Sequence, residues 1–183
     1  MQPSRLARFA AAAAAAFCAH AWAAEPPVLK SGMWEVTRAG GQQADRKSVT
    51  TMCLDESVQA QMREFGMGAA KEMCTQNDRS FEGNKMTMKA TCKLGPTTMK
   101  STSVMTFNGN NSYHMDGTAT YDPPMMNMAS SKTSVDAKWV GPCRPGQQPG
   151  DVTLETGQTI NIKQMMLAPP SGMIPPVQAP AKN

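Results

Sequence analysis

Residues 112–121, SYHMDGTATY, alternate between apolar or small side chains and polar ones. Successive side chains of a β-strand point to opposite faces, so this pattern indicates a strand with one face on a core and one in water. We expect Tyr113 and Met115 to face inward, and His114 and Asp116 to face water.

Three further segments follow the same alternation. The inward sets are Met86, Met88, Ala90 and Cys92 in residues 85–93, and Val135, Ala137 and Trp139 in residues 132–141. Met99, Met105 and Phe107 indicate another strand with a more polar middle. We therefore expect a mainly β fold, either a curved antiparallel meander sheet or a partly open barrel, with one short α-helix.

Two loops rich in Gly and Asn set the register of these strands. Residues 82–84, EGN, predict a three-residue loop in which Phe81 faces Lys85. At residues 108–111, NGNN, a two-residue Asn-Gly loop would turn Tyr113 to the wrong face. We therefore expect a loop of three or five residues at that second position.

The helix is predicted from residues 55–65, DESVQAQMREF. Asp55 is a favourable N-cap residue, and Val58, Met62 and Phe65 follow it at helical spacing. This pattern predicts one amphipathic helix of about three turns.

The N-terminus predicts export. It has a short basic region, an apolar run from Phe9 to Cys18 and small residues around Ala23, which is the pattern of a cleavable signal peptide over residues 1–23. We expect cleavage near Ala23 and a periplasmic location. The apolar run is shorter than the ~20 residues that a membrane span needs, and we expect no transmembrane segment in the mature chain.

The remaining chain predicts a single β-rich domain over residues 24–166 and a disordered, proline-rich tail over residues 167–183. Loss of Arg5 and Arg8 would leave 16 Lys and Arg against 14 Asp and Glu. A net charge of only +2 gives no reason to expect a nucleic-acid partner.

Four cysteines follow the predicted signal peptide, namely Cys53, Cys74, Cys92 and Cys143. An even number in an exported chain predicts two disulfides. Counting outward from the loop at residues 82–84 places Cys74 opposite Cys92, so we favour Cys74–Cys92 together with Cys53–Cys143. The alternative pairing, Cys53–Cys74 with Cys92–Cys143, stays open.

Several short motifs accompany the cysteines: KSGMWEV at residues 30–36, MCL at 52–54, GPC at 141–143, PGD at 149–151, and Gly157. Together they resemble an exported bacterial family known only as domain of unknown function 3617, over residues 28–166. The resemblance implies a periplasmic location and a small β-rich fold. No activity is established for that family, so the resemblance carries no catalytic residues to this chain.

No motif predicts catalysis. His114 is the only histidine after residue 23, and the alternation places it on the water-facing side beside Asp116. Disulfide-bonded cysteines are not available as nucleophiles, and Gly-x-Ser-x-Gly is absent from the sequence. We expect no catalytic residues, no cofactor and no enzyme activity.

Two binding functions remain. Inward methionine and aromatic side chains on a curved sheet can enclose a small apolar ligand, so we expect an envelope binding module for such a ligand or for an envelope protein. The alternative is a Cu(I)-binding protein, because thioethers are soft ligands and the chain holds 17 methionines. Met125, Met126 and Met128 are the candidate metal ligands.

Overall fold

The computed structural model describes residues 25–41 and 43–167. Their strands are β1 (Gly32–Gly40), β2 (Gln43–Leu54), β3 (Cys74–Glu82), β4 (Lys85–Leu94), β5 (Thr97–Asn108), β6 (Ser112–Met125), β7 (Met128–Gly141), β8 (Asp151–Thr153) and β9 (Thr159–Asn161). The helices are α1 (Glu56–Met73) and α2 (Ile162–Leu167). The predicted signal peptide, and the predicted tail from residue 168 onward, lie outside the described residues.

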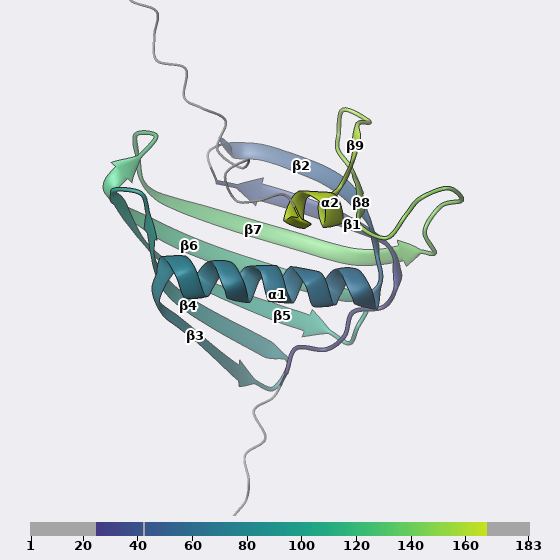
Figure 1. Ribbon diagram of the computed structural model, residues 1–183, viewed down its shortest axis with the longest axis horizontal. Coiled ribbons are helices and arrows are strands. Elements are labelled where there is room, and N and C mark those ends of the chain that lie inside the picture. The colour runs from purple at the N-terminus through teal and green to yellow at the C-terminus, as the bar shows by residue number, and fades with distance from the viewer. Residues whose placement is uncertain (1–24, 42, 168–183) are drawn as a thin grey trace, which may run out of the picture.

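The strands form one antiparallel sheet in the order β3-β4-β5-β6-β7-β1-β2-β8-β9, with β3 and β9 at its edges. Strands β3 to β7 are a continuous meander, as the alternation predicts. The mainly β fold is therefore confirmed. Of the two predicted forms, the structure has the curved antiparallel sheet and not the partly open barrel. Figure 1 shows α1 crossing one face of the curved sheet, which we call the inner face; the opposite face is the outer face.

Burial follows the predicted alternation. Val135 and Ala137 on β7 are buried, whereas Asp136 between them is exposed. On β6, His114 and Asp116 are exposed, with half-buried residues on either side of each. The expected assignment of these side chains to the inner and outer faces is correct.

The β3–β4 loop corrects one prediction. Glu82 pairs with Lys85, so the loop has two residues, and Phe81 faces Met86 rather than Lys85. A shift of one residue would separate the two cysteines, but the register shifts again between Cys74 and Gln76. Because of this irregularity, Cys74 still pairs with Cys92. The predicted pairing is therefore correct, although the loop length from which it was predicted is wrong.

The β5–β6 loop is confirmed. Asn108 pairs with Ser112, which leaves a three-residue loop, and Phe107 pairs with Tyr113. Gly109 supplies a φ of 61° in that loop, a backbone conformation that glycine adopts without a steric penalty. Tyr113 consequently faces the inner side of the sheet, where its ring lies 6.3 Å from that of Phe107.

Helix α1 begins as predicted and ends later than predicted. Asp55 caps it by accepting a hydrogen bond from the backbone N–H of Val58 at 2.8 Å. The predicted helix covers residues 55–65, where Val58, Met62 and Phe65 have helical spacing. The helix nevertheless runs to Met73, since good helix formers follow Gly66 and Gly68 and the disulfide at Cys74 holds its end.

The fully packed core lies at one end of the sheet. It is built from Trp34, Leu54, Val58 and Ala137, so the first turn of α1 closes over β1, β2 and β7 there.

Strands β1 and β2 were not predicted from alternation, because their pattern is irregular. The charged Arg38 occupies an inner position on β1, and the apolar, exposed Val49 occupies an outer position on β2.

Both favoured disulfides are present and they bracket α1. Cys53–Cys143 lies just before the helix and Cys74–Cys92 just after it, with sequence separations of 90 and 18 residues. Each end of the helix is therefore covalently held to the body of the sheet. Two disulfides also indicate an oxidising compartment outside the cytoplasm.

Candidate functional site

Helix α1 packs tightly on the sheet only through its first turn. Val58 is fully buried and Gln59 is 8% exposed, but Met62 and Phe65, one and two turns later, are 43% and 42% exposed. On the sheet below, the inner-face methionines of β5 and β6 are only half-buried. The middle of α1 therefore covers the sheet incompletely, although Met86 and Phe107 on the sheet are buried.

The space between them is a cleft of about 240 Å³, which we call the α1 cleft. It is lined by Pro26, Pro27, Leu29, Met52, Leu54, Gln59, Met62, Arg63, Met86, Met105, Phe107 and Tyr113. Four of these residues are methionines, whose flexible side chains adapt to different apolar shapes. The lining is apolar with a few polar groups, which is the usual composition of a small-molecule site.

The N-terminal segment forms one wall of the cleft and is held by Gln59. The side chain of Gln59 accepts a hydrogen bond from Leu29 N–H at 2.8 Å and donates one to the Leu29 carbonyl at 2.9 Å. Lys30 N–H donates to the Asn110 carbonyl at 2.8 Å, which joins the same segment to the β5–β6 loop. This wall is consequently fixed before any ligand arrives.

Two polar residues that line the cleft, Arg63 and Tyr113, have side chains without a polar partner among the described residues, and Tyr113 also lines the outer hollow described below. Within the described residues, neither the guanidinium of Arg63 nor the hydroxyl of Tyr113 forms a hydrogen bond or ion pair. Burial raises the pKa of Tyr113, so its hydroxyl stays neutral and can donate a hydrogen bond at neutral pH. A tyrosine hydroxyl in a partly buried position usually has a partner.

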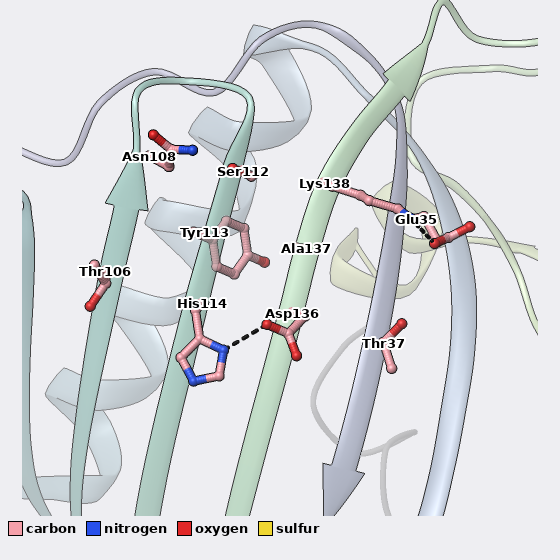
Figure 2. Close-up of a pocket in the computed structure, with 10 residues that line it drawn as sticks. All are labelled: Glu35, Thr37, Thr106, Asn108, Ser112, Tyr113, His114, Asp136, Ala137 and Lys138. Carbon is pink, nitrogen blue, oxygen red and sulfur yellow. Dashed lines mark hydrogen bonds and ion pairs between the residues drawn. The ribbon is translucent and has the colours of Figure 1, made fainter.

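A larger hollow of about 510 Å³ lies on the outer face, around His114 (Figure 2). His114 Nδ1 lies 2.7 Å from an Asp136 oxygen, and its Nε2 lies 3.1 Å from an Asp116 oxygen. Lys138 and Glu35 form an ion pair of 2.8 Å at the same hollow. The charged groups here compensate one another, which distinguishes this hollow from the α1 cleft.

The carboxylates perturb the titration of His114. The hydrogen bond to Asp136, and then the one to Asp116, raise the pKa of His114 above its ordinary value. The hydrogen bond from His114 lowers the pKa of Asp116 in turn, with a further contribution from Ser134. The result is an exposed ion-pair cluster on the sheet surface, and the side-chain hydrogen bonds of His114 go to these two carboxylates.

The candidate copper ligands lie at the β6–β7 turn. Met125 pairs with Met128 across the hairpin, and Met126 and Asn127 form the turn with φ values of 49° and 62°. Met126 is 74% exposed. Met125 and Met128 share a hollow with Arg38, whose positive charge opposes the binding of a cation beside it.

Comparison with known families identifies the chain. A family model described as protein of unknown function (DUF3617) matches residues 29–143, which include all four cysteines of the disulfides. This chain belongs to the DUF3617 family. No curated protein and no solved structure matches it.

Two structural features of this DUF3617 member concern its metal-ligating side chains and its helices. Among residues 25–41 and 43–167, no group of three or more His, Cys, Asp or Glu side chains is arranged to hold a metal ion. In the same part of the chain, neither helix is long and apolar enough to cross a membrane.

Sequence reasoning found some of the residues at these sites and missed others. It predicted the inner position of Tyr113 and the outer position of His114. It missed Asp136 as the second partner of His114, although pairing β6 with β7 in register would have placed the two side by side. It also missed Arg63 and Gln59, because a helical pattern does not reveal where the helix leaves the sheet.

Proposed function

We propose that this protein is a non-catalytic, periplasmic binding module that takes a small apolar ligand into the α1 cleft. The observation that carries the proposal is the incomplete packing of α1 on the inner face of the sheet. An apolar surface left open between a helix and a sheet costs free energy in water, and an apolar ligand would recover it.

The architecture supports binding by a preformed site. Disulfides on both sides of α1 keep the helix over the sheet, while its middle is free of tight packing. The wall held by Gln59 closes one side. A site that is formed before binding avoids part of the ordering cost of association.

The size of the cleft limits the ligand. A water molecule takes ~30 Å³ of liquid volume, so 240 Å³ holds about eight methylene-sized groups. At ~0.8 kcal/mol for each buried methylene, a filling chain gains about 6 kcal/mol before the cost of association. A gain of about 6 kcal/mol corresponds to a dissociation constant of about 0.04 mM, and the cost of association makes the binding of a simple chain of this length weaker than that limit.

Native mass spectrometry of protein taken from the periplasm tests the proposal. The informative variant is Met105→Gln, which places an amide in the cleft. Its control is Val104→Gln, because Val104 precedes it on β5 and points to the outer face with 36% exposure. We expect a small-molecule adduct on the wild-type protein and on Val104→Gln, and a weaker adduct on Met105→Gln.

Three results would contradict the proposal or part of it. An adduct with the mass of an envelope protein in place of a small molecule would show that the cleft is a protein-docking surface. Equal adducts on both variants would show that the small molecule binds elsewhere. A cytoplasmic location of the processed protein would refute the periplasmic assignment, which is supported by the disulfides.

Cu(I) binding is the second candidate, and the cross-strand pairing of Met125 with Met128 favours it by placing two thioether-bearing residues side by side. Replacing Met125, Met126 and Met128 by Leu removes the thioethers at similar volume. Cu(I) uptake by the wild-type protein that is lost in this triple variant would support the hypothesis. Unchanged uptake, or none in the wild type, would refute it.

A further inference from the structure

The α1 cleft carries one positive charge, on Arg63, with which no described residue forms an ion pair. Positions three and four residues away on a helix are the neighbours that can pair with a charged side chain. For Arg63 these are Gln59, Ala60, Gly66 and Met67, and none of them is acidic. Among the described residues, the cleft lining contains no carboxylate either, and Arg63 is its one charged side chain.

The apolar part and the charged part of the cleft belong to one surface. Met86, Met105 and Phe107 come from the sheet below, whereas Arg63 is exposed on the helix. Tyr113 lies in the same lining and packs against Trp34, with ring centroids 6.1 Å apart. A ligand that fills the cleft therefore meets apolar side chains along its length and a cation at the helix.

We propose that the ligand of the α1 cleft is a fatty-acid-like monocarboxylate, whose chain occupies the cleft and whose carboxylate binds Arg63 and the hydroxyl of Tyr113. This inference rests on the proposed function, because it assigns a ligand class to the same site. A carboxylate accepts hydrogen bonds from both groups and matches the planar guanidinium.

The single cation also selects among anionic head groups. A carboxylate carries one negative charge, which Arg63 neutralises. A phosphate monoester carries about −1.5 to −2 charges at neutral pH and would leave part of its charge without a partner in this lining. Charge matching therefore favours the carboxylate.

Isothermal titration calorimetry with octanoate and octan-1-ol tests the inference, since the two probes share a chain length and differ in charge. The variant is Arg63→Gln. Its control is Lys71→Gln, which removes the same charge from an exposed residue of α1 that is not part of the cleft lining. The full chain with both disulfides intact is used throughout.

We expect Arg63→Gln to weaken octanoate binding by about 5- to 10-fold and to change octan-1-ol binding by less than about twofold, as for a charge-assisted pair at a partly exposed site. Lys71→Gln should change either probe by less than about twofold. Tyr113→Phe removes only the hydroxyl and should weaken octanoate binding by about two- to fivefold.

The outcomes separate the two proposals. If octan-1-ol binds and Arg63→Gln leaves octanoate binding unchanged, the monocarboxylate inference is wrong and the apolar site remains. An equal loss of both probes in Arg63→Gln also overturns the inference, because it shows that Arg63 shapes the cleft rather than binding the head group. If neither probe binds the wild-type protein, the proposed function itself fails.

Discussion

Replacing Gly66 and Gly68 of α1 by alanine should stabilise the protein. An added Cβ at either position meets no atom within 4 Å, apart from the backbone of the helix itself and the chain neighbours. Alanine is favoured over glycine in an exposed helix interior by about 0.5–1 kcal/mol per residue. The double variant should therefore gain about 1–2 kcal/mol, which corresponds to a rise in Tm of about 2–8 °C for a domain of this size.

Urea denaturation followed by circular dichroism measures this gain as an increase in the free energy of unfolding with an unchanged slope. The control is the same substitution at Gly32, whose φ is 136° and whose added Cβ would clash with the carbonyl oxygen of Gly141. Gly32→Ala should cost about 2 kcal/mol or more. The same substitution, glycine to alanine, is thus expected to raise the free energy of unfolding at Gly66 and Gly68 and to lower it at Gly32.

A destabilised Gly66→Ala, Gly68→Ala variant would refute the reasoning. It would mean that the middle of α1 packs closely against another part of the protein, so that the helix leaves no room for a cleft. A gain confined to one of the two positions would locate the close contact.

Three further predictions concern the elements that hold and flank the cleft. Removing Cys53–Cys143 by alanine substitution should cost about 4–5 kcal/mol of stability, and removing Cys74–Cys92 about 3 kcal/mol, because the two disulfides close loops of 90 and 18 residues. A larger cost for the shorter loop, measured by urea denaturation, would contradict the chain-entropy model. Gln59→Ala should cost about 2–3 kcal/mol through the loss of its two hydrogen bonds with Leu29. Gln61→Ala should leave stability unchanged or raise it, because it removes a buried Oε1 that accepts no hydrogen bond from the described residues; equal costs of the two changes would disprove the role of Gln59. NMR titration should give His114 a pKa above 6.5, lowered more by Asp136→Asn than by Asp116→Asn. Because the folded-state pKa is the raised one, this cluster stabilises the protein fully below pH ~6.5 and loses its contribution as the pH rises through the folded-state value, so the reverse trend would count against it.

The sequence predicts the meander well because strands β4 to β7 each bury one face and expose the other. Polar and apolar residues then alternate strictly, as at His114 and Asp116. This alternation alone excludes a two-residue β5–β6 loop, because such a loop would turn Tyr113 to the wrong face. The β3–β4 loop shows the limit of parity, since a loop of two residues and a later register shift lead to the same cysteine pair as a loop of three.

The candidate site is harder to predict because it depends on where packing stops. Val58, Met62 and Phe65 have the spacing of a buried helical face, yet only Val58 is buried. The distance between a helix and a sheet is a tertiary property that no local pattern encodes. Arg63 illustrates the same point, since a lone arginine on a helix acquires meaning only when its neighbours and the lining of the cleft are known.

The central claim is that the α1 cleft binds an apolar ligand, and NMR of methionine methyl groups during titration with octan-1-ol tests it most directly. The methyl signals of the four methionines in the cleft lining, Met52, Met62, Met86 and Met105, should shift together and saturate with a single dissociation constant. Met67 and Met165, which are 52% and 48% exposed and are not part of that lining, should stay unchanged. Shifts confined to the exposed methionines, or no saturable shifts in the cleft, would contradict the account.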